Sequence, residues 1–212
     1  MERRLLLASG NAGKLRELRE LLQPAGWRVL APAEVDRGAV TVLEGSRSYL
    51  ENATAKAVAF ARASGLPALA DDSGLEVDAL DGGPGVLSAR FGGPAASTDR
   101  ERCALLLRRL DGLPHARRGA RFRAVLVLAL PGGATFAREG SVDGHIAEAE
   151  RGASGFGYDP VFELANGRTM AELGEEKQRI SHRARALSAM MEVLEAVDDP
   201  QHPPAVTAGA RR

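Results

Sequence analysis

The chain has 212 residues, and its 28 basic and 28 acidic side chains give a formal net charge of zero. This balance argues against a general nucleic-acid-binding protein, because neutralising many phosphates requires a clustered excess of positive charge. No apolar run approaches the ~18 residues of a membrane span, residues 5–8 are too few for a signal peptide, and the single cysteine, Cys103, excludes an internal disulfide. We therefore expect a cytoplasmic protein.

The predicted elements of the first third alternate between strands and helices. They are strands at residues 4–8 and 27–31, helices at about 11–23 and 48–64, and an apolar strand at 67–70. Asp71-Asp72-Ser73-Gly74 follows the last of these directly. This order is typical of α/β or α+β proteins.

The remaining elements continue the alternation after a glycine-rich loop at residues 81–94. They are a helix at about 98–110, a strand at 120–130, a second strand at about 134–142, a short strand after residue 158, and a helix at about 182–197. Pro131-Gly132-Gly133 predicts a hairpin between the two longer strands. We find no internal repeat or linker, so residues 1–197 are predicted to form one domain, and the composition of 198–212 predicts a disordered tail.

The first candidate for function is the segment Ser9 to Lys14, at a strand-to-helix junction. Asn11 is a plausible helix N-cap, which places Lys14 at the third helical position. Free amide groups at a helix start bind anions, and a cation there suggests an anionic partner. An ordinary capped helix with a solvated lysine explains the segment equally well.

The second candidate is the acidic pair Asp71-Asp72. Neighbouring carboxylates repel each other, and a hard cation such as Mg²⁺ relieves that repulsion. An Asp-rich turn is the alternative interpretation. Glu51 fits a capping box with Ser48, Asn52 and Lys56 share one helix face, and Glu44 is the other acid that could reach a metal.

Two later segments complete the candidates. In residues 155–160, glycines flank Phe156 and would let its backbone and ring approach a flat ligand, although a tight turn also explains them. In residues 177–183, Ser181 is a plausible N-cap that places two cationic residues, His182 and Arg183, at a helix start. We predict that Cys103 is a buried apolar residue, and that His115, His145 and His202 lie on the surface or in loops.

Lysine is rare in this chain. Only Lys14, Lys56 and Lys177 are lysines, and the other 25 of the 28 basic residues are arginines. A lysine kept in such a chain indicates a site that needs a compact ammonium group. All three lie in the candidate segments.

Together these segments resemble the pyrophosphatases of deaminated purine nucleoside triphosphates, the inosine/xanthosine triphosphate pyrophosphatase family. The resemblance rests on SGNAGK (9–14), ENATAKA (51–57), DDSGLEVDALDGGPGVLSARF (71–91), GFGYDPVF (155–162) and KQRISHRARAL (177–187). It implies an elongated α/β fold with a mixed sheet and two lobes, and an active site in the cleft between them. It also implies a homodimer that uses Mg²⁺ to hydrolyse ITP, dITP or XTP to the monophosphate and pyrophosphate.

The resemblance also implies roles for single residues. The residues implied to bind the triphosphate are Ser9, Gly10, Asn11, Ala12, Gly13 and Lys14. Asp72 is implied as the proton acceptor and a metal ligand, with Glu44 as a further ligand, although Glu44-Gly45-Ser46 departs from the usual spacing. Substrate contacts are implied for Ser73, Phe156, Gly157, Tyr158, Asp159, Lys177, His182 and Arg183.

The residue chemistry agrees with this reading, since Lys56 and Lys14 can hold phosphates and Asp72 can act as a base. Buried donors aimed at O6 of hypoxanthine would reject adenine, and His182, Arg183 or an amide near Lys177 could supply them. Other hydrolases of modified triphosphates and a nucleotide sensor without turnover stay open as alternatives. Whether Glu51 or Asp71 also coordinates metal is left open too.

Overall fold

The computed structural model describes residues 3–35, 40 and 48–198, so Glu44, His202 and the tail from residue 199 lie outside the described residues. The chain forms two compact units. Unit 1 comprises Met1–Asp72, Val125–Glu139 and Ala186–Arg212, and unit 2 comprises Ser73–Ala124 and Gly140–Arg185. No helix in the described part of the chain is long and apolar enough to cross a membrane.

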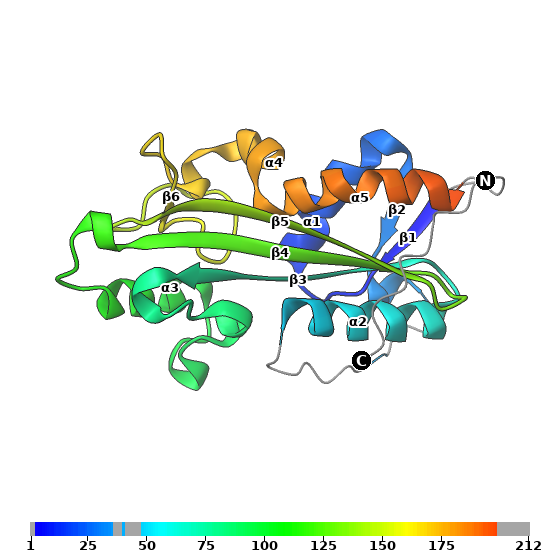
Figure 1. The fold of residues 1–212 in the computed structure, drawn as a ribbon, viewed down its shortest axis with the longest axis horizontal. Helices are drawn as coiled ribbons and strands as arrows, with labels where there is room; N and C mark the ends of the chain where they lie inside the picture. The colour runs from blue at the N-terminus through cyan, green and yellow to red at the C-terminus, as the bar shows by residue number, and fades with distance from the viewer. Residues whose placement is uncertain (1–2, 36–39, 41–47, 199–212) are drawn as a thin grey trace. The chain divides into compact units, whose positions relative to one another are not determined.

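The strands of the described residues form one mixed sheet, in the order β2-β1-β3-β4-β5-β6 (Figure 1). Their bounds are β1 (Arg3–Leu7), β2 (Trp27–Leu30), β3 (Ala68–Val77), β4 (Gly119–Ala129), β5 (Thr135–Ile146) and β6 (Phe162–Glu163). β1 is parallel to β2 and to β3, with Leu6 opposite Leu30 and Ala68, whereas β5 and β6 are antiparallel. The predicted α/β class with a mixed sheet is confirmed.

Three of the α-helices in the described residues begin at the capping residues that the sequence predicts. Their bounds are α1 (Ala12–Leu22), α2 (Tyr49–Ser64), α3 (Asp99–Arg109), α4 (Lys177–Ile180) and α5 (His182–Asp198). The side chains of Asn11 and Ser48 each accept a hydrogen bond from the backbone N–H three residues later, and Gly65 ends α2 in the left-handed conformation. α4 is a short helix that the sequence pattern does not predict.

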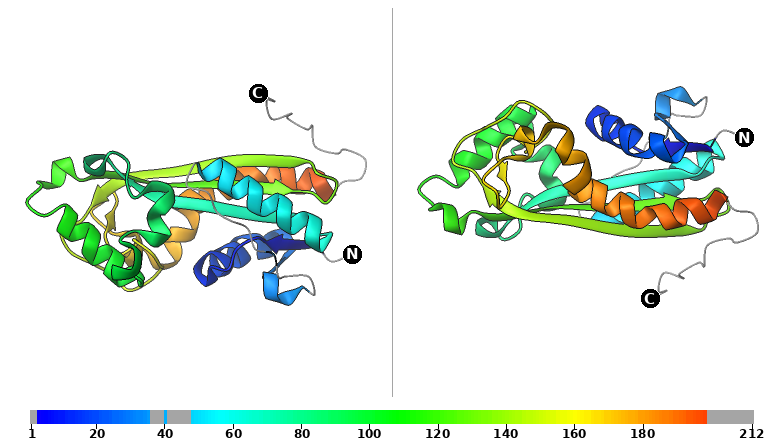
Figure 2. Two further views of the ribbon diagram at one scale, coloured as in Figure 1. Left: turned by 90° about the horizontal axis from the view of Figure 1, so that it is seen from below. Right: turned by 90° about the horizontal axis from the view of Figure 1, so that it is seen from above.

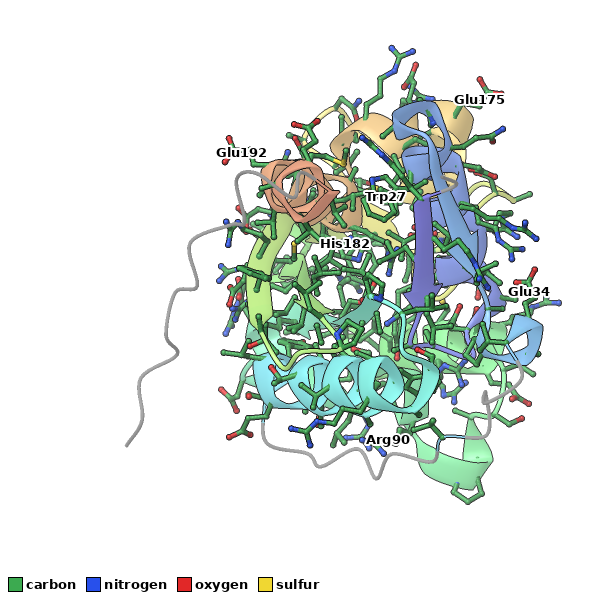
Figure 3. The ribbon with its side chains drawn as sticks, turned by 90° about the vertical axis from the view of Figure 1, so that its right-hand side faces the viewer. Trp27, Glu34, Arg90, Glu175, His182 and Glu192 are labelled. Carbon is green, nitrogen blue, oxygen red and sulfur yellow. The ribbon has the colours of Figure 1, made fainter. Side chains whose placement is uncertain are left out.

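The core of unit 1 surrounds β1. Leu5, Leu6 and Leu7 are fully buried, as expected of a parallel strand with neighbours on both sides. α2 and α5 lie on opposite sides of the strands in this unit (Figures 1 and 3). Ala53, Ala57 and Ala61 of α2 are fully buried, and their small side chains let the helix backbone approach the sheet closely.

Unit 2 has a core of its own, built from β3 to β6, α3 and the segments around α4. Its buried members include Leu75, Phe122, Ile146 and Phe162, and Cys103 is among them. The prediction that Cys103 is a buried apolar residue is therefore confirmed. The Cys103 thiol is 1% exposed, and burial raises its pKa to about 12.

Two boundaries differ from the sequence prediction. β4 and β5 form the predicted hairpin across residues 131–133 and run side by side (Figure 2), but β5 continues to Ile146 rather than ending near residue 142. β3 does not end at Ala70 and continues to Val77, so the acidic pair lies inside a strand and not in a turn after it. Pairing with neighbouring strands outweighs the low strand preference of Asp, Ser and Gly there.

Candidate functional site

The position of Asp71 and Asp72 within β3 separates their side chains. Successive side chains of a strand point to opposite faces of the sheet. Accordingly, the Asp71 carboxylate contacts Lys14 of α1, and the Asp72 carboxylate contacts Asn52 and Lys56 of α2. The alternative interpretation, an Asp-rich turn, is therefore wrong, because both residues lie within β3.

Lys14 is held by hydrogen bonds from its backbone N–H and from its ammonium group. Its backbone N–H donates to Oδ1 of Asn11 at 3.0 Å, which places Lys14 at the third position of α1, as predicted. Its ammonium group donates to Asp71 Oδ1 at 3.1 Å and to the Asp71 carbonyl oxygen at 3.0 Å. Of the segment before it, Gly10, Asn11 and Ala12 are exposed, and the amides of this first helical turn face no intrahelical acceptor.

Asp72 lies between two donors from α2. Nζ of Lys56 is 2.9 Å from Asp72 Oδ1, and Nδ2 of Asn52 is 3.1 Å from Oδ2. Asn52 and Lys56 face the same way because they are one helical turn apart. The Asp72 side chain is 12% exposed and its carboxylate has about four lone pairs, so two donors leave it able to accept a proton or bind a cation.

The two lysines converge on one atom. Lys14 Nζ lies 3.0 Å and Lys56 Nζ lies 3.3 Å from the Asp71 carbonyl oxygen, so the two ammonium groups are at most 6.3 Å apart. Two like charges so close in a largely buried place require compensation. Asp71 and Asp72 supply it, and the four charges sum to zero.

The donor chemistry of this group fits Mg²⁺. In the described part of the chain, no three His, Cys, Asp or Glu side chains gather into a ready metal site. Magnesium, however, is usually held by one or two carboxylates, with phosphate oxygens and waters completing its shell. Asp72, with its accessible lone pairs, meets that requirement. Glu44 lies outside the described residues, and Glu51 is exposed at the start of α2, where its N–H bonds the Ser48 hydroxyl.

In unit 2, Asp159 organises the glycine-rich segment. Its Oδ2 accepts a hydrogen bond from the Phe156 backbone N–H at 2.8 Å and from Lys177 Nζ at 2.6 Å. Lys177 also lies over the Phe156 ring, 4.9 Å from its centroid. Gly155 is required here, because its φ is +84° and a Cβ would lie 2.1 Å from Asp159 Oδ2.

The start of α5 brings further predicted residues to the same segment. Ser181 Oγ accepts from the Ala184 N–H, so Ser181 is the predicted N-cap and His182 and Arg183 are the first helical residues. The Arg183 guanidinium, 1% exposed, lies 5.4 Å from the Phe156 ring centroid and donates to Ser73 Oγ at 3.2 Å. His182 is buried and stacks on the ring of Phe122 at 4.8 Å.

α3 supplies residues that the sequence did not indicate. Asp99 Oδ2 accepts from the Gly157 N–H at 2.7 Å, and the Cys103 thiol donates to the Gly157 carbonyl at 3.3 Å. The neighbouring Tyr158 is buried, and its hydroxyl donates to the Ser88 carbonyl at 2.8 Å. Some 54 to 58 residues separate α3 from Gly157, so no local pattern could have revealed these contacts.

All three lysines are paired with aspartates of the predicted segments. Lys14 pairs with Asp71, Lys56 with Asp72 and Lys177 with Asp159, at 3.1, 2.9 and 2.6 Å. The aspartate side chains of these pairs are largely buried, at 0%, 12% and 3% exposure, which is unusual for charged residues. Lysine scarcity was therefore a useful signal for these positions.

Two histidines have partners that the sequence did not predict. His115 and His145 stack at 4.8 Å, and His115 Nε2 lies 2.9 Å from Glu163 Oε1. The contact is partly exposed, as the surface prediction implies, but the two residues are not isolated. Both residues belong to unit 2.

Comparison with known proteins agrees with the motif pattern. Residues 5–193 match the model of the Ham1 family. A dITP/XTP pyrophosphatase of Thermus thermophilus is 56% identical over 89% of this chain and 90% of its own length. One of Deinococcus radiodurans is 50% identical over 89% and 92%.

The solved structures give the same result. A HAM1 protein of Coxiella burnetii matches with a TM-score of 0.80 and 40% identity, over 91% of this chain and 98% of its own. A structure from Mycobacterium abscessus, described as a nucleoside-triphosphatase or dITP/XTP pyrophosphatase, has a TM-score of 0.70 and 43% identity, over 89% and 98%. Family match, sequence identity and fold agree over nearly the whole described chain, and the protein belongs to the Ham1 family.

Proposed function

We propose that this Ham1-family protein is a nucleoside triphosphate pyrophosphatase that hydrolyses deaminated purine triphosphates (ITP, dITP and XTP) to the monophosphate and pyrophosphate, with Mg²⁺. One observation carries the proposal: Lys14 and Lys56 converge on the Asp71 carbonyl beside the accessible carboxylate of Asp72. Dedicated pyrophosphatases are also what the similar proteins are named for.

The triphosphate is assigned to the residues of unit 1. Lys14, Lys56 and the first amides of α1 offer positive charge and N–H donors to phosphate oxygens. Because the four charged side chains sum to zero, they cannot by themselves neutralise a triphosphate. Mg²⁺, held by Asp72 and the phosphates, would supply the missing positive charge and would acidify a bound water.

We assign Asp72 the role of general base. Hydrolysis between the α- and β-phosphates requires that the attacking water lose a proton, and a carboxylate with unused lone pairs can accept it. Asn52 and Lys56 each donate to one oxygen of Asp72 and so fix the plane of the carboxylate. We expect Asp72→Asn to abolish turnover while the protein still folds, as its circular dichroism spectrum would show. Near-normal activity would remove Asp72 from the mechanism.

The purine is assigned to the residues of unit 2. Phe156 offers a ring for stacking, Lys177 and Arg183 bring buried donors over it, and His182 is a further buried donor of this unit. Hypoxanthine and xanthine carry an oxygen at position 6, whereas adenine carries an amino group. Each donor left unpaired by adenine costs about 1–3 kcal/mol, and a few together give strong rejection.

The decisive experiment measures pyrophosphate release with Mg²⁺ across a panel of deaminated and standard triphosphates. We expect ITP, dITP and XTP to be turned over far faster than ATP or GTP, and equal turnover of all five would refute the proposal. Release of inorganic phosphate with a diphosphate product would indicate the alternative, a different triphosphate hydrolase. His182→Ala and Arg183→Ala, assayed with ITP and ATP, test base selection, which unchanged ratios in both would contradict.

Further assays address the phosphate role and the assembly. Lys14→Ala should mainly raise KM for triphosphates, and an effect confined to the Mg²⁺ requirement would contradict phosphate binding. We also propose a cytoplasmic homodimer without nucleic-acid or membrane partners. Light scattering coupled to size exclusion measures the assembly directly.

A further inference from the structure

We propose that Asp71 is a positioning residue, whose carboxylate holds the Lys14 ammonium group in place for phosphate and takes no direct part in metal binding. The two adjacent aspartates of β3 thus have different tasks. The phosphate part of this inference rests on the proposed function, whereas the positioning of Lys14 does not.

The strand geometry separates the two carboxylates. Asp71 and Asp72 are consecutive residues of β3, so their side chains leave opposite faces of the strand. Asp71 meets Lys14 from α1, and Asp72 meets Asn52 and Lys56 from α2. A cation bound by Asp72 on the α2 face therefore lies on the other side of the strand from the Asp71 carboxylate.

Because Asp71 is buried, its carboxylate does not contact substrate directly. Asp71 is 0% exposed, whereas the side chains of Lys14 and Asp72 are 13% and 12% exposed. A fully enclosed carboxylate cannot touch a ligand that arrives from solvent. It can act only through a neighbour that is accessible, and Lys14 is such a neighbour.

The contact fixes the ammonium group at two points. Lys14 Nζ bonds both the carbonyl oxygen and Oδ1 of Asp71, and the backbone of Lys14 is tied to the Asn11 cap. A free lysine side chain loses much rotamer freedom when it binds a ligand. Here the side chain is ordered beforehand. The negative charge of Asp71 also offsets the repulsion between Lys14 and Lys56, which approach within 6.3 Å.

The presence of only three lysines makes a direct test possible. Protein labelled with ¹⁵N-lysine has three side-chain ammonium groups, and such groups give NMR signals when ion pairing slows their exchange with water. Lys14→Gln identifies the Lys14 signal. We expect Asp71→Asn to shift or broaden the Lys14 signal while that of Lys177, paired with Asp159, keeps its position as an internal control for the fold.

The NMR measurement uses no nucleotide, so its outcome is independent of the proposed function. An unchanged Lys14 signal in Asp71→Asn would overturn the positioning role. If Asp71→Asn does not fold, the Lys177 signal also changes, and Asp71→Ser, which removes the charge but keeps an oxygen acceptor, replaces it in the same comparison.

Kinetics then test whether positioning serves phosphate binding. We expect Asp71→Asn to raise KM for ITP about 10-fold or more, with a smaller change in kcat and an unchanged Mg²⁺ requirement. In a Lys14→Gln background the same substitution should add less than about 3-fold, because both changes remove one interaction. Fully multiplicative effects, or a strongly raised Mg²⁺ requirement, would overturn the inference. Absence of any pyrophosphatase activity in the wild type would refute the proposed function alone.

Discussion

The ion pair between Lys177 and Asp159 offers a quantitative test of how unit 2 holds Phe156. Both side chains are buried, with exposures of 7% and 3%, and their Nζ and Oδ2 atoms are 2.6 Å apart. Lys177→Met keeps much of the length of the side chain but removes its charge. The Asp159 carboxylate then stays enclosed, with the Phe156 N–H at 2.8 Å still donating to it.

Leaving one partner of a buried ion pair uncompensated costs about 3–5 kcal/mol. For a chain of this length, 1 kcal/mol lowers the melting temperature by roughly 2–4 °C. We therefore expect Lys177→Met to melt about 6–20 °C below the wild type in a thermal scan followed by circular dichroism. The loss comes from the negative charge that Lys177 no longer offsets and not from lost packing.

A second substitution separates these two causes. Asp159→Asn in the Lys177→Met background removes the carboxylate charge that Lys177 had offset, and the Asn oxygen can still accept from the Phe156 N–H. The double variant should recover at least half of the lost stability. Arg168→Met is the matched control, since its pair with Glu176 is exposed and such pairs contribute only about 0–1 kcal/mol.

Two results would refute the reasoning. One is a Lys177→Met variant that melts within about 2 °C of the wild type, because a pair this buried cannot be lost at so small a cost. The other is a double variant less stable than Lys177→Met, because that would locate the cost in packing or in the loss of the Asp159 hydrogen bonds.

Three further predictions concern unit 2. Gly155→Ala should destabilise the protein and raise KM for the nucleotide, since its Cβ would strike Asp159 Oδ2; wild-type kinetics would contradict this. The hydrogen bond from Arg151 lowers the pKa of Glu163, so its stabilisation is complete above about pH 4.5 and is lost as the pH falls further. Urea midpoints of Glu163→Gln and wild type should therefore converge below that pH, and a constant gap would refute the assignment. With a pKa of about 12, Cys103 should resist iodoacetamide at pH 8 until guanidinium unfolds the protein, and rapid labelling of the native protein would show that its burial is incomplete.

The sequence by itself determined the features that depend on nearby residues. Asn11, Ser48 and Ser181 were predicted as helix caps, and each accepts the expected backbone N–H three residues on. The hairpin at residues 131–133 follows from its proline and glycines. Capping and turn formation use interactions within three or four residues, so a local pattern is sufficient to predict them.

The sequence motifs also singled out the candidate site residues, including all three lysines. What they did not provide was the arrangement of those residues. From the sequence, Asp71 and Asp72 fitted either a cation site, because neighbouring carboxylates repel each other, or an Asp-rich turn. Their pairing into β3 instead sends the two carboxylates to opposite faces, where each meets a different lysine.

Only the tertiary structure decided these partners, because sheet pairing and side-chain packing join residues that are far apart in the chain. Lys14 and Asp71 are 57 residues apart, and Gly157 lies 58 residues from Asp99, the side chain that holds its amide. Such contacts leave no periodicity and no spacing that a sequence can display. They form only when the strands pair into one sheet and bring residues of separate motifs within hydrogen-bonding distance.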